Sequence, residues 1–200
     1  MRHRLLILVL VLAALTLNVA SVSAQRIGVY FDTAGTICAT QIPPFTPTTW
    51  YIIADPGVRG GFEAAEFRLD GAAASWFMSA TSDPAASVVI GSPILGGTYM
   101  SYPTCQNGPR VLFTINGFAA GVVANNLLTV REHTTPSDPA LSCPWLEACP
   151  GPSLEARDGP VFDRFCATGG QAMINGGPFA CSSALPTLPS TWGRVKSLYR

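Results

Sequence analysis

Apolar and polar side chains alternate in short runs along most of the chain between residues 26 and 175. In the run RIGVYFD (26–32), Ile27, Val29 and Phe31 share one face, and the residues between them share the other. Successive side chains of a strand point to opposite faces of a sheet, so this alternation predicts β-strands. The predicted strands cover residues 26–32, 48–55, 63–71, 75–81, 86–92, 97–102, 109–115, 126–133, 161–168 and 171–175.

Turn-forming residues bound these runs, and helical periodicity is nearly absent. Asn116 and Gly117 follow one run and form a favoured pair for a tight hairpin, because both central positions of that turn adopt positive φ. These features predict an all-β domain over residues 25–181, built as an antiparallel, immunoglobulin-like β-sandwich. The proline-rich residues 134–160 are interpreted either as a long stapled loop or as a short strand flanked by turns.

Catalytic side chains are hard to find in this pattern. In the run 63–71, alternation turns Ala65 and Phe67 inward and Glu66 outward. Glu63 and Glu66 then point to opposite faces, whereas glycoside hydrolysis needs two carboxylates around one bond, so we interpret both as surface charges. His133 falls on the same strand face as Arg131, so we expect it to face solvent at the end of a strand. No G-x-S-x-G motif accompanies it, so a catalytic triad is not indicated.

The first 24 residues have the layout of a secretory signal peptide. Arg2 and Arg4 precede an apolar run from Leu5 to Leu17, and small residues lead to Ala24. The apolar run is shorter than the roughly 20 residues of a membrane span, so we expect cleavage after Ala24. No second long apolar run follows, which predicts no transmembrane segment after cleavage.

All six cysteines lie after the predicted cleavage site, and an even number in an exported chain predicts three disulfides. A thiolate metal site is the alternative, but no C-x2-C pair occurs. Preference for short loops favours the pairs Cys38–Cys105, Cys143–Cys149 and Cys166–Cys181.

Charge and motif searches exclude several classes of protein. Without the leader, ten basic and twelve acidic side chains remain, so the electrostatics do not favour a nucleic-acid partner. Asp158–Gly159 with Asp163, and Asp32 near Gly35, do not fit a calcium loop and are interpreted as turn residues. Four glycine pairs lack a G-x-G-x-x-G context and are interpreted as turns or bulges. We therefore predict no metal and no cofactor.

The C-terminal end differs from the rest of the chain. Residues 182–190 predict an extended linker, because they combine proline with serine and threonine. Residues 191–200 predict a short, basic, amphipathic tail, in which a helical arrangement would separate the charges from the apolar stripe. The residues expected to contact a partner, either a protein or the cell envelope, are Trp192, Arg194, Val195, Lys196, Leu198, Tyr199 and Arg200.

Two segments carry a resemblance to known proteins. The opening IGVYFDTAGT (27–36) and the ending STWGRVKSLYR (190–200) resemble the GVYFDxxGT opening and WGxVKxLYR-type tail of secreted proteins of environmental bacteria, and TGGQAMIN (168–175) is similar to that group too. The resemblance implies an exported β domain and a shared sorting or attachment tail, and no activity. More loosely, FEAAEFRLDG (62–71) is similar to cohesin-type sandwiches.

Together, these observations predict a secreted, periplasmic or surface-located module with a structural, adhesion or binding role and no catalysis. The alternative is a secreted hydrolase of carbohydrate or peptide, whose carboxylates converge only in the fold. A cleft lined by two or more acids with aromatic walls would favour this alternative.

Overall fold

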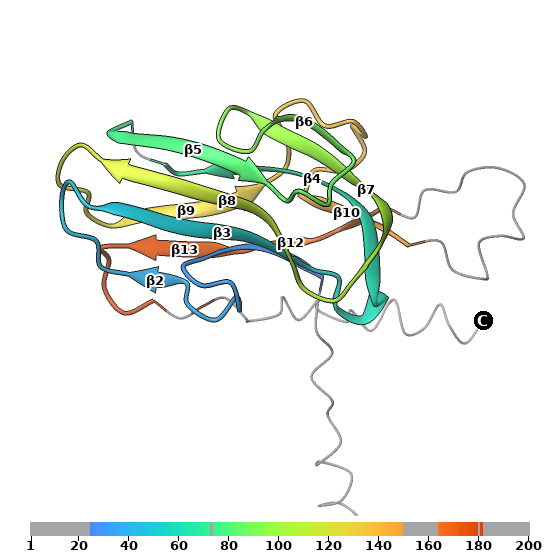
Figure 1. Cartoon of the computed structure of the whole chain (residues 1–200), viewed down its shortest axis with the longest axis horizontal. Helices are drawn as coiled ribbons and strands as arrows, with labels where there is room; N and C mark the ends of the chain where they lie inside the picture. The colour runs from blue at the N-terminus through green and yellow to red at the C-terminus, as the bar shows by residue number, and fades with distance from the viewer. Residues whose placement is uncertain (1–24, 73, 150–163, 180, 182–200) are drawn as a thin grey trace, which may run out of the picture.

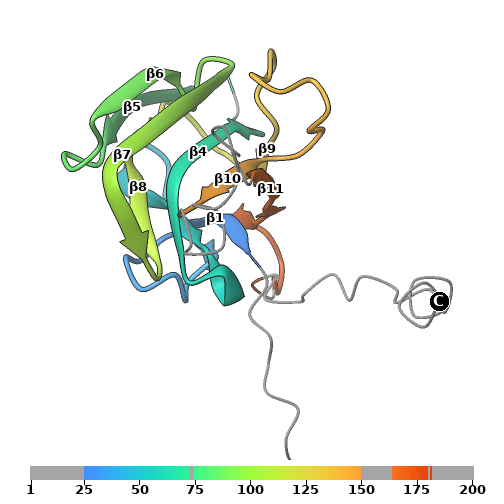
Figure 2. The same cartoon turned by 90° about the vertical axis from the view of Figure 1, so that its right-hand side faces the viewer.

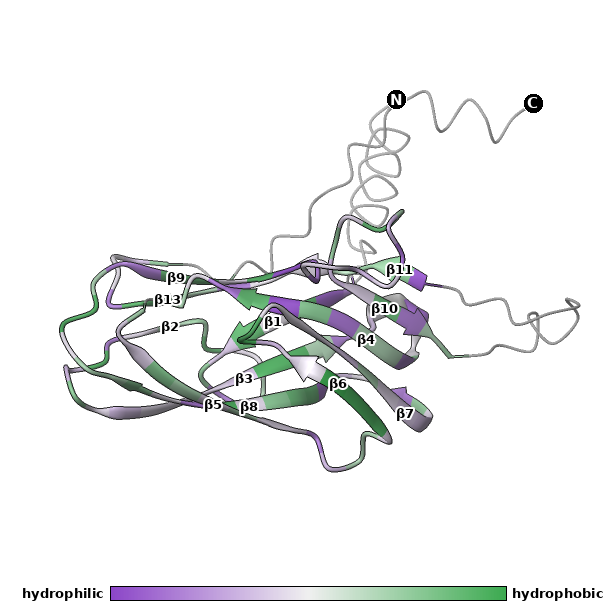
Figure 3. Cartoon of the chain, turned by 90° about the horizontal axis from the view of Figure 1, so that it is seen from above, coloured by the Kyte–Doolittle hydropathy of each residue, from purple (hydrophilic) through white to green (hydrophobic). Residues whose placement is uncertain are grey.

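The computed structural model describes residues 25–72, 74–149, 164–179 and 181. Within them the chain forms two β-sheets that face each other, as the end-on view in Figure 2 and the view from above in Figure 3 show. The predicted signal peptide, linker and tail lie outside the described residues and stay predictions. The described residues contain no helix that is long and apolar enough to cross a membrane.

The first sheet has five strands. In spatial order they are β12 (Thr168–Gly169), β1 (Arg26–Tyr30), β3 (Pro47–Asp55), β8 (Arg110–Ala119) and β5 (Trp76–Ser82). Of these, β3, β8 and β5 are labelled in Figure 1. A single turn of 3-10 helix, η1 (Gly57–Arg59), follows β3.

The second sheet has eight strands. Six follow the order β11 (Arg164–Cys166), β10 (Trp145–Ala148), β4 (Gly61–Asp70), β9 (Asn126–Arg131), β13 (Gln171–Ile174) and β2 (Ala39–Thr40). The other two form a hairpin, in which β7 (Gly97–Asn107) pairs with β4 and β6 (Val88–Ser92) pairs with β7.

Each of the ten predicted ranges contains strand residues, and the predicted sandwich is confirmed. Strand β10 decides between the two interpretations of residues 134–160 in favour of a short strand. Two pairings are parallel rather than antiparallel, β1 with β12 and β2 with β13. In each pair the two-residue strand, β12 or β2, is the edge strand of its sheet.

The predicted hairpin turn at Asn116 and Gly117 is wrong, because both residues lie inside β8. Trp50 and Trp76 pack against Gly117 from the core, and a Cβ added there would lie 2.3 Å from the Trp50 ring. The two indoles meet edge to face, with their ring centroids 5.3 Å apart. Gly117 is therefore a site of close packing, a role for glycine that a turn motif does not distinguish.

All six cysteines form disulfides, but the preferred pairing is wrong. The bonds are Cys38–Cys181, Cys105–Cys149 and Cys143–Cys166. Cys143 and Cys149 flank β10, and an extended strand separates its flanking residues by about 3.3 Å per position. That places them well beyond the reach of a disulfide, which needs Cα atoms within about 7 Å.

The Cys105–Cys149 bond crosses the first residue of β4. Strands β7 and β10 flank β4 on its two sides, and Phe62 pairs with Gln106 on one strand and with Ala148 on the other. Gly61 lies beneath the bond, where an added Cβ would lie 2.5 Å from Cys105 Sγ and 2.9 Å from Cys149 Sγ. The absence of a side chain at Gly61 allows the disulfide to tie three strands together.

Candidate functional site

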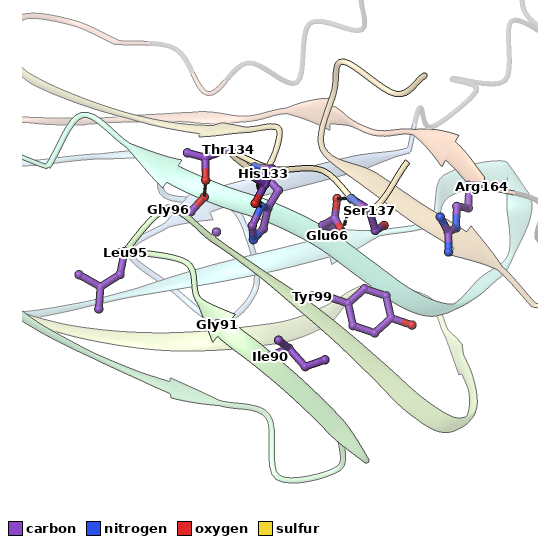
Figure 4. A pocket seen from close by; sticks show the side chains of 12 residues that line it. Glu66, Ile90, Gly91, Leu95, Gly96, Tyr99, His133, Thr134, Ser137 and Arg164 are labelled. Carbon is purple, nitrogen blue, oxygen red and sulfur yellow. Dashed lines mark hydrogen bonds between the residues drawn. The ribbon is translucent and has the colours of Figure 1, made fainter. Parts of the chain in front are cut away.

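A hollow of about 650 Å³ lies on the outer side of the second sheet, over β4 and the β6–β7 hairpin. Figure 4 shows Glu66 and Ser137 on one side of it and Ile90 and Tyr99 on the other. The residues that line it are Glu66, Ile90, Gly91, Leu95, Gly96, Gly97, Tyr99, His133, Thr134, Thr135, Ser137 and Arg164. They come from four strands (β4, β6, β7 and β11), the β6–β7 turn and the segment after β9.

Glu66 is buried at the base of this region, with only 3% of its surface exposed. Glu66 Oε1 accepts a hydrogen bond from Trp145 Nε1 at 3.1 Å, and the Ser137 N–H donates to both carboxylate oxygens, at 3.0 and 3.2 Å. The prediction of a surface charge is therefore wrong. Alternation placed Glu66 correctly on the outer face, away from Phe67, but a later segment of the chain covers that face.

The segment that covers Glu66 runs from Thr134 to Cys143, and we call it the covering segment. It is attached to the β6–β7 turn. The Thr134 N–H donates to Gly96 O at 3.0 Å, and Thr134 Oγ1 donates to the same oxygen at 2.8 Å. Ser137 then reaches Glu66, and the Cys143–Cys166 disulfide fixes the end of the segment to β11. The hollow is thus held by backbone hydrogen bonds and a covalent link.

His133 lies two residues beyond the end of β9 and lines the hollow, half-buried. The prediction of a solvent-facing strand end is wrong in this respect. Its ring packs on Gly97, where an added Cβ would lie 2.2 Å from the ring. The Thr135 N–H donates to His133 Nδ1 at 3.0 Å, which orients the ring over the hollow.

The buried Trp145 contacts both Glu66 and Arg164, the latter of which lines the hollow. The Arg164 guanidinium lies 4.5 Å from the centroid of the buried Trp145 ring, and the Tyr99 ring lies 6.0 Å away on another side. Arg164 Nε also lies 3.7 Å from Glu147 Oε2. Burial raises the pKa of Glu147 above its usual value, with a further contribution from the charge of Glu63, and Arg164 opposes both.

The rim of the hollow is apolar and exposed. Ile90 on β6 and Leu95 in the β6–β7 turn are large hydrophobic side chains in solvent, and Leu95 is 83% exposed. Val88, on the same face of β6 as Ile90, is also exposed. The whole stretch from Pro84 to Pro109 carries no charged residue. Exposed apolar side chains gathered beside a hollow are typical of interaction sites.

Of the two calcium candidates, one lies in the described residues and is used within its own loop. The Asp32 carboxylate accepts hydrogen bonds from Thr36 N, Thr36 Oγ1 and Ile37 N, and so holds its own loop. Asp158 and Asp163 lie outside the described residues. Within the part of the chain that the structure describes, no group of three or more His, Cys, Asp or Glu is placed to hold a metal ion.

The chemistry available to the hollow is limited. Among its lining residues Glu66 is the one acid, and both of its oxygens already accept hydrogen bonds from the protein. Glu63 and Glu147 do not line it. The hollow therefore lacks the two facing carboxylates that the hydrolase alternative requires. The apolar rim was missed in the sequence, because the pattern predicted a strand over residues 86–92 but not the exposure of its apolar side chains.

No protein-family model matches the chain, and no curated protein matches it. Among solved structures, the fold is similar to that of the seventh ScaB type I cohesin from Pseudobacteroides cellulosolvens, with a TM-score of 0.50 and 9% sequence identity. The match covers 78% of this chain and 94% of that chain. It confirms the cohesin-like sandwich at the level of the fold; the motifs at the two ends of the chain stay predictions.

Proposed function

We propose that the protein is a secreted, non-catalytic module that binds a protein partner through the hollow and its apolar rim. The observation that carries this proposal is the state of Glu66. Its carboxylate is buried and fully used in holding the covering segment, so it serves structure rather than acid–base chemistry.

The rim supplies what a partner needs. Ile90 and Leu95 stand in solvent beside a depression that contains the Tyr99 ring and the His133 ring. An apolar anchor next to a hollow with a few polar groups is the usual centre of a protein interface. The fixed backbone around Gly96 and Thr134 means that binding requires little reordering.

Secretion is part of the proposal. Three disulfides among the described residues suit an oxidising compartment, and the leader predicted over residues 1–24 provides the route. The tail residues from Trp192 to Arg200 are proposed as a separate recognition segment for export or attachment.

Capture from the extracellular fraction of the producing organism tests the proposal. We expect the immobilised domain to retain a discrete protein, and Ile90→Asp or Leu95→Asp to weaken its binding at least about tenfold, because a charge enters an apolar contact. Val122→Asp is the matched control, since Val122 is 82% exposed and Leu95 83%, but Val122 lies in the β8–β9 loop.

Equal binding by all three variants would place the interface elsewhere. The hydrolase alternative predicts instead that the purified domain cleaves polysaccharides or peptides. Turnover that disappears in Glu66→Gln, in a variant that stays folded, would overturn the non-catalytic proposal.

A further inference from the structure

The first sheet presents a regular, uncharged surface to solvent on the side away from the hollow. Strands β3, β8 and β5 lie next to each other (Figure 1), and their outward side chains stand in three cross-strand rows. The rows are Pro47–Phe118–Phe77, Thr49–Asn116–Ser79 and Tyr51–Thr114–Thr81. We call these nine residues the outer grid. Their neighbours along each strand, such as Trp50 and Ile115, face the core.

Phenylalanine rings lie at one end of the outer grid. Phe77 is 70% exposed, and Phe118 stands directly opposite it on the next strand. Phe45, just outside the grid, is 64% exposed and its ring centroid lies 6.4 Å from that of Phe118. Phe45 is held there by its N–H, which donates to Ala119 O at 3.1 Å. Three exposed phenylalanines therefore form one continuous apolar platform.

Hydroxyl and amide groups make up the next two rows. Thr49 Oγ1 bonds to Asn116 Oδ1 at 3.0 Å, which orients the amide group of Asn116 on the surface. Ser79 and Thr81 continue the rows onto β5 with exposed hydroxyls. None of the nine side chains carries a charge. The surface thus offers stacking at one end and neutral hydrogen-bonding groups beside it.

We propose that the outer grid is a second binding site, which takes a neutral polysaccharide. A sugar ring has an apolar face that packs on an aromatic ring, and equatorial hydroxyls that bond to amide and hydroxyl groups. A charged ligand would find no counter-charge among the nine residues. A second copy of the chain is disfavoured, because the two polar rows would be buried against each other in a flat contact.

The occupant is therefore recognised by stacking on Phe77 and Phe118 and by hydrogen bonds to Asn116 and Ser79. This site is independent of the proposed protein-binding hollow, because the two lie on different sheets.

The test is affinity electrophoresis in gels containing cellulose derivatives, starch, mannan or laminarin, with polyanionic alginate as a charged comparison. We expect at least one neutral polysaccharide to retard the domain, equally at low and high salt. Phe77→Ala should weaken this binding at least about tenfold, since truncating a central aromatic anchor usually does so. Asn116→Ala should weaken it less.

Val122→Ala is the control for loss of an exposed apolar side chain and should not change retardation. Phe77 is exposed, so its removal should leave the melting temperature within about 2 °C of the wild type, which verifies folding. Absence of retardation by every neutral polysaccharide would overturn the proposal. So would retardation that persists in Phe77→Ala, or a change from dimer to monomer in that variant.

Discussion

Replacing Cys38 and Cys181 together by serine is expected to lower the free energy of unfolding by about 5 kcal/mol. The bond joins residues separated by 143 positions, and a disulfide that closes a longer loop restricts the unfolded chain more. The measurement is guanidinium unfolding of the purified domain, followed by tryptophan fluorescence.

The other two bonds serve as internal controls for this effect. Cys105–Cys149 and Cys143–Cys166 have sequence separations of 44 and 23, which predict losses of about 4 and about 3.5 kcal/mol. A loss for the Cys38–Cys181 pair that is smaller than that for Cys143–Cys166 would contradict the pairing. Thiol titration of the denatured, unreduced protein should find no reactive thiol.

Replacing Glu66 by alanine is expected to lower the free energy of unfolding by about 3 kcal/mol, because two buried donors lose their acceptor. These donors are the Ser137 N–H and Trp145 Nε1. Glu66→Gln keeps one acceptor oxygen and should lose about half as much. The measurement is again chemical unfolding.

Glu63→Ala is the matched control on the same strand. Glu63 is half-buried, and its charge adds to the repulsion at Glu147, so its removal should change stability by less than about 0.5 kcal/mol. If Glu66→Ala and Glu63→Ala have the same small effect, Glu66 does not hold the covering segment. Its carboxylate would then be free for another role.

The strands could be predicted from the sequence because alternation is a local property of the chain. The run containing Ile27 and Val29 forms β1, and the run containing Trp50 and Ile52 forms β3. Predictions from local motifs failed where a residue packs against a neighbour that is distant in the sequence. Gly117 resembles a turn glycine, but its position requires glycine for another reason. Trp50, which is far away in the sequence, packs against it and leaves no room for a side chain.

The candidate site depends even more on long-range contacts. Alternation gives the face of Glu66 but not its burial, because the covering residues Ser137 and Trp145 follow more than 70 positions later. The disulfides show the same limit. The preference for short loops favoured the pair Cys143–Cys149. The strand β10 between these two residues is extended and keeps them apart, and Cys149 instead bonds to Cys105 on the other side of β4. Sequence spacing carries no information about such crossings.

The apolar rim of the hollow is proposed to contact a protein partner. Site-specific photo-crosslinking tests this contact most directly, with benzoylphenylalanine placed at Leu95 or at Val122 in the full chain expressed by the producing organism. Both positions are more than 80% exposed, so the two probes are equally accessible. We predict a discrete crosslinked adduct from position 95 that disappears when Ile90→Asp is added. No adduct at position 95, or the same adducts from position 122, would contradict the account.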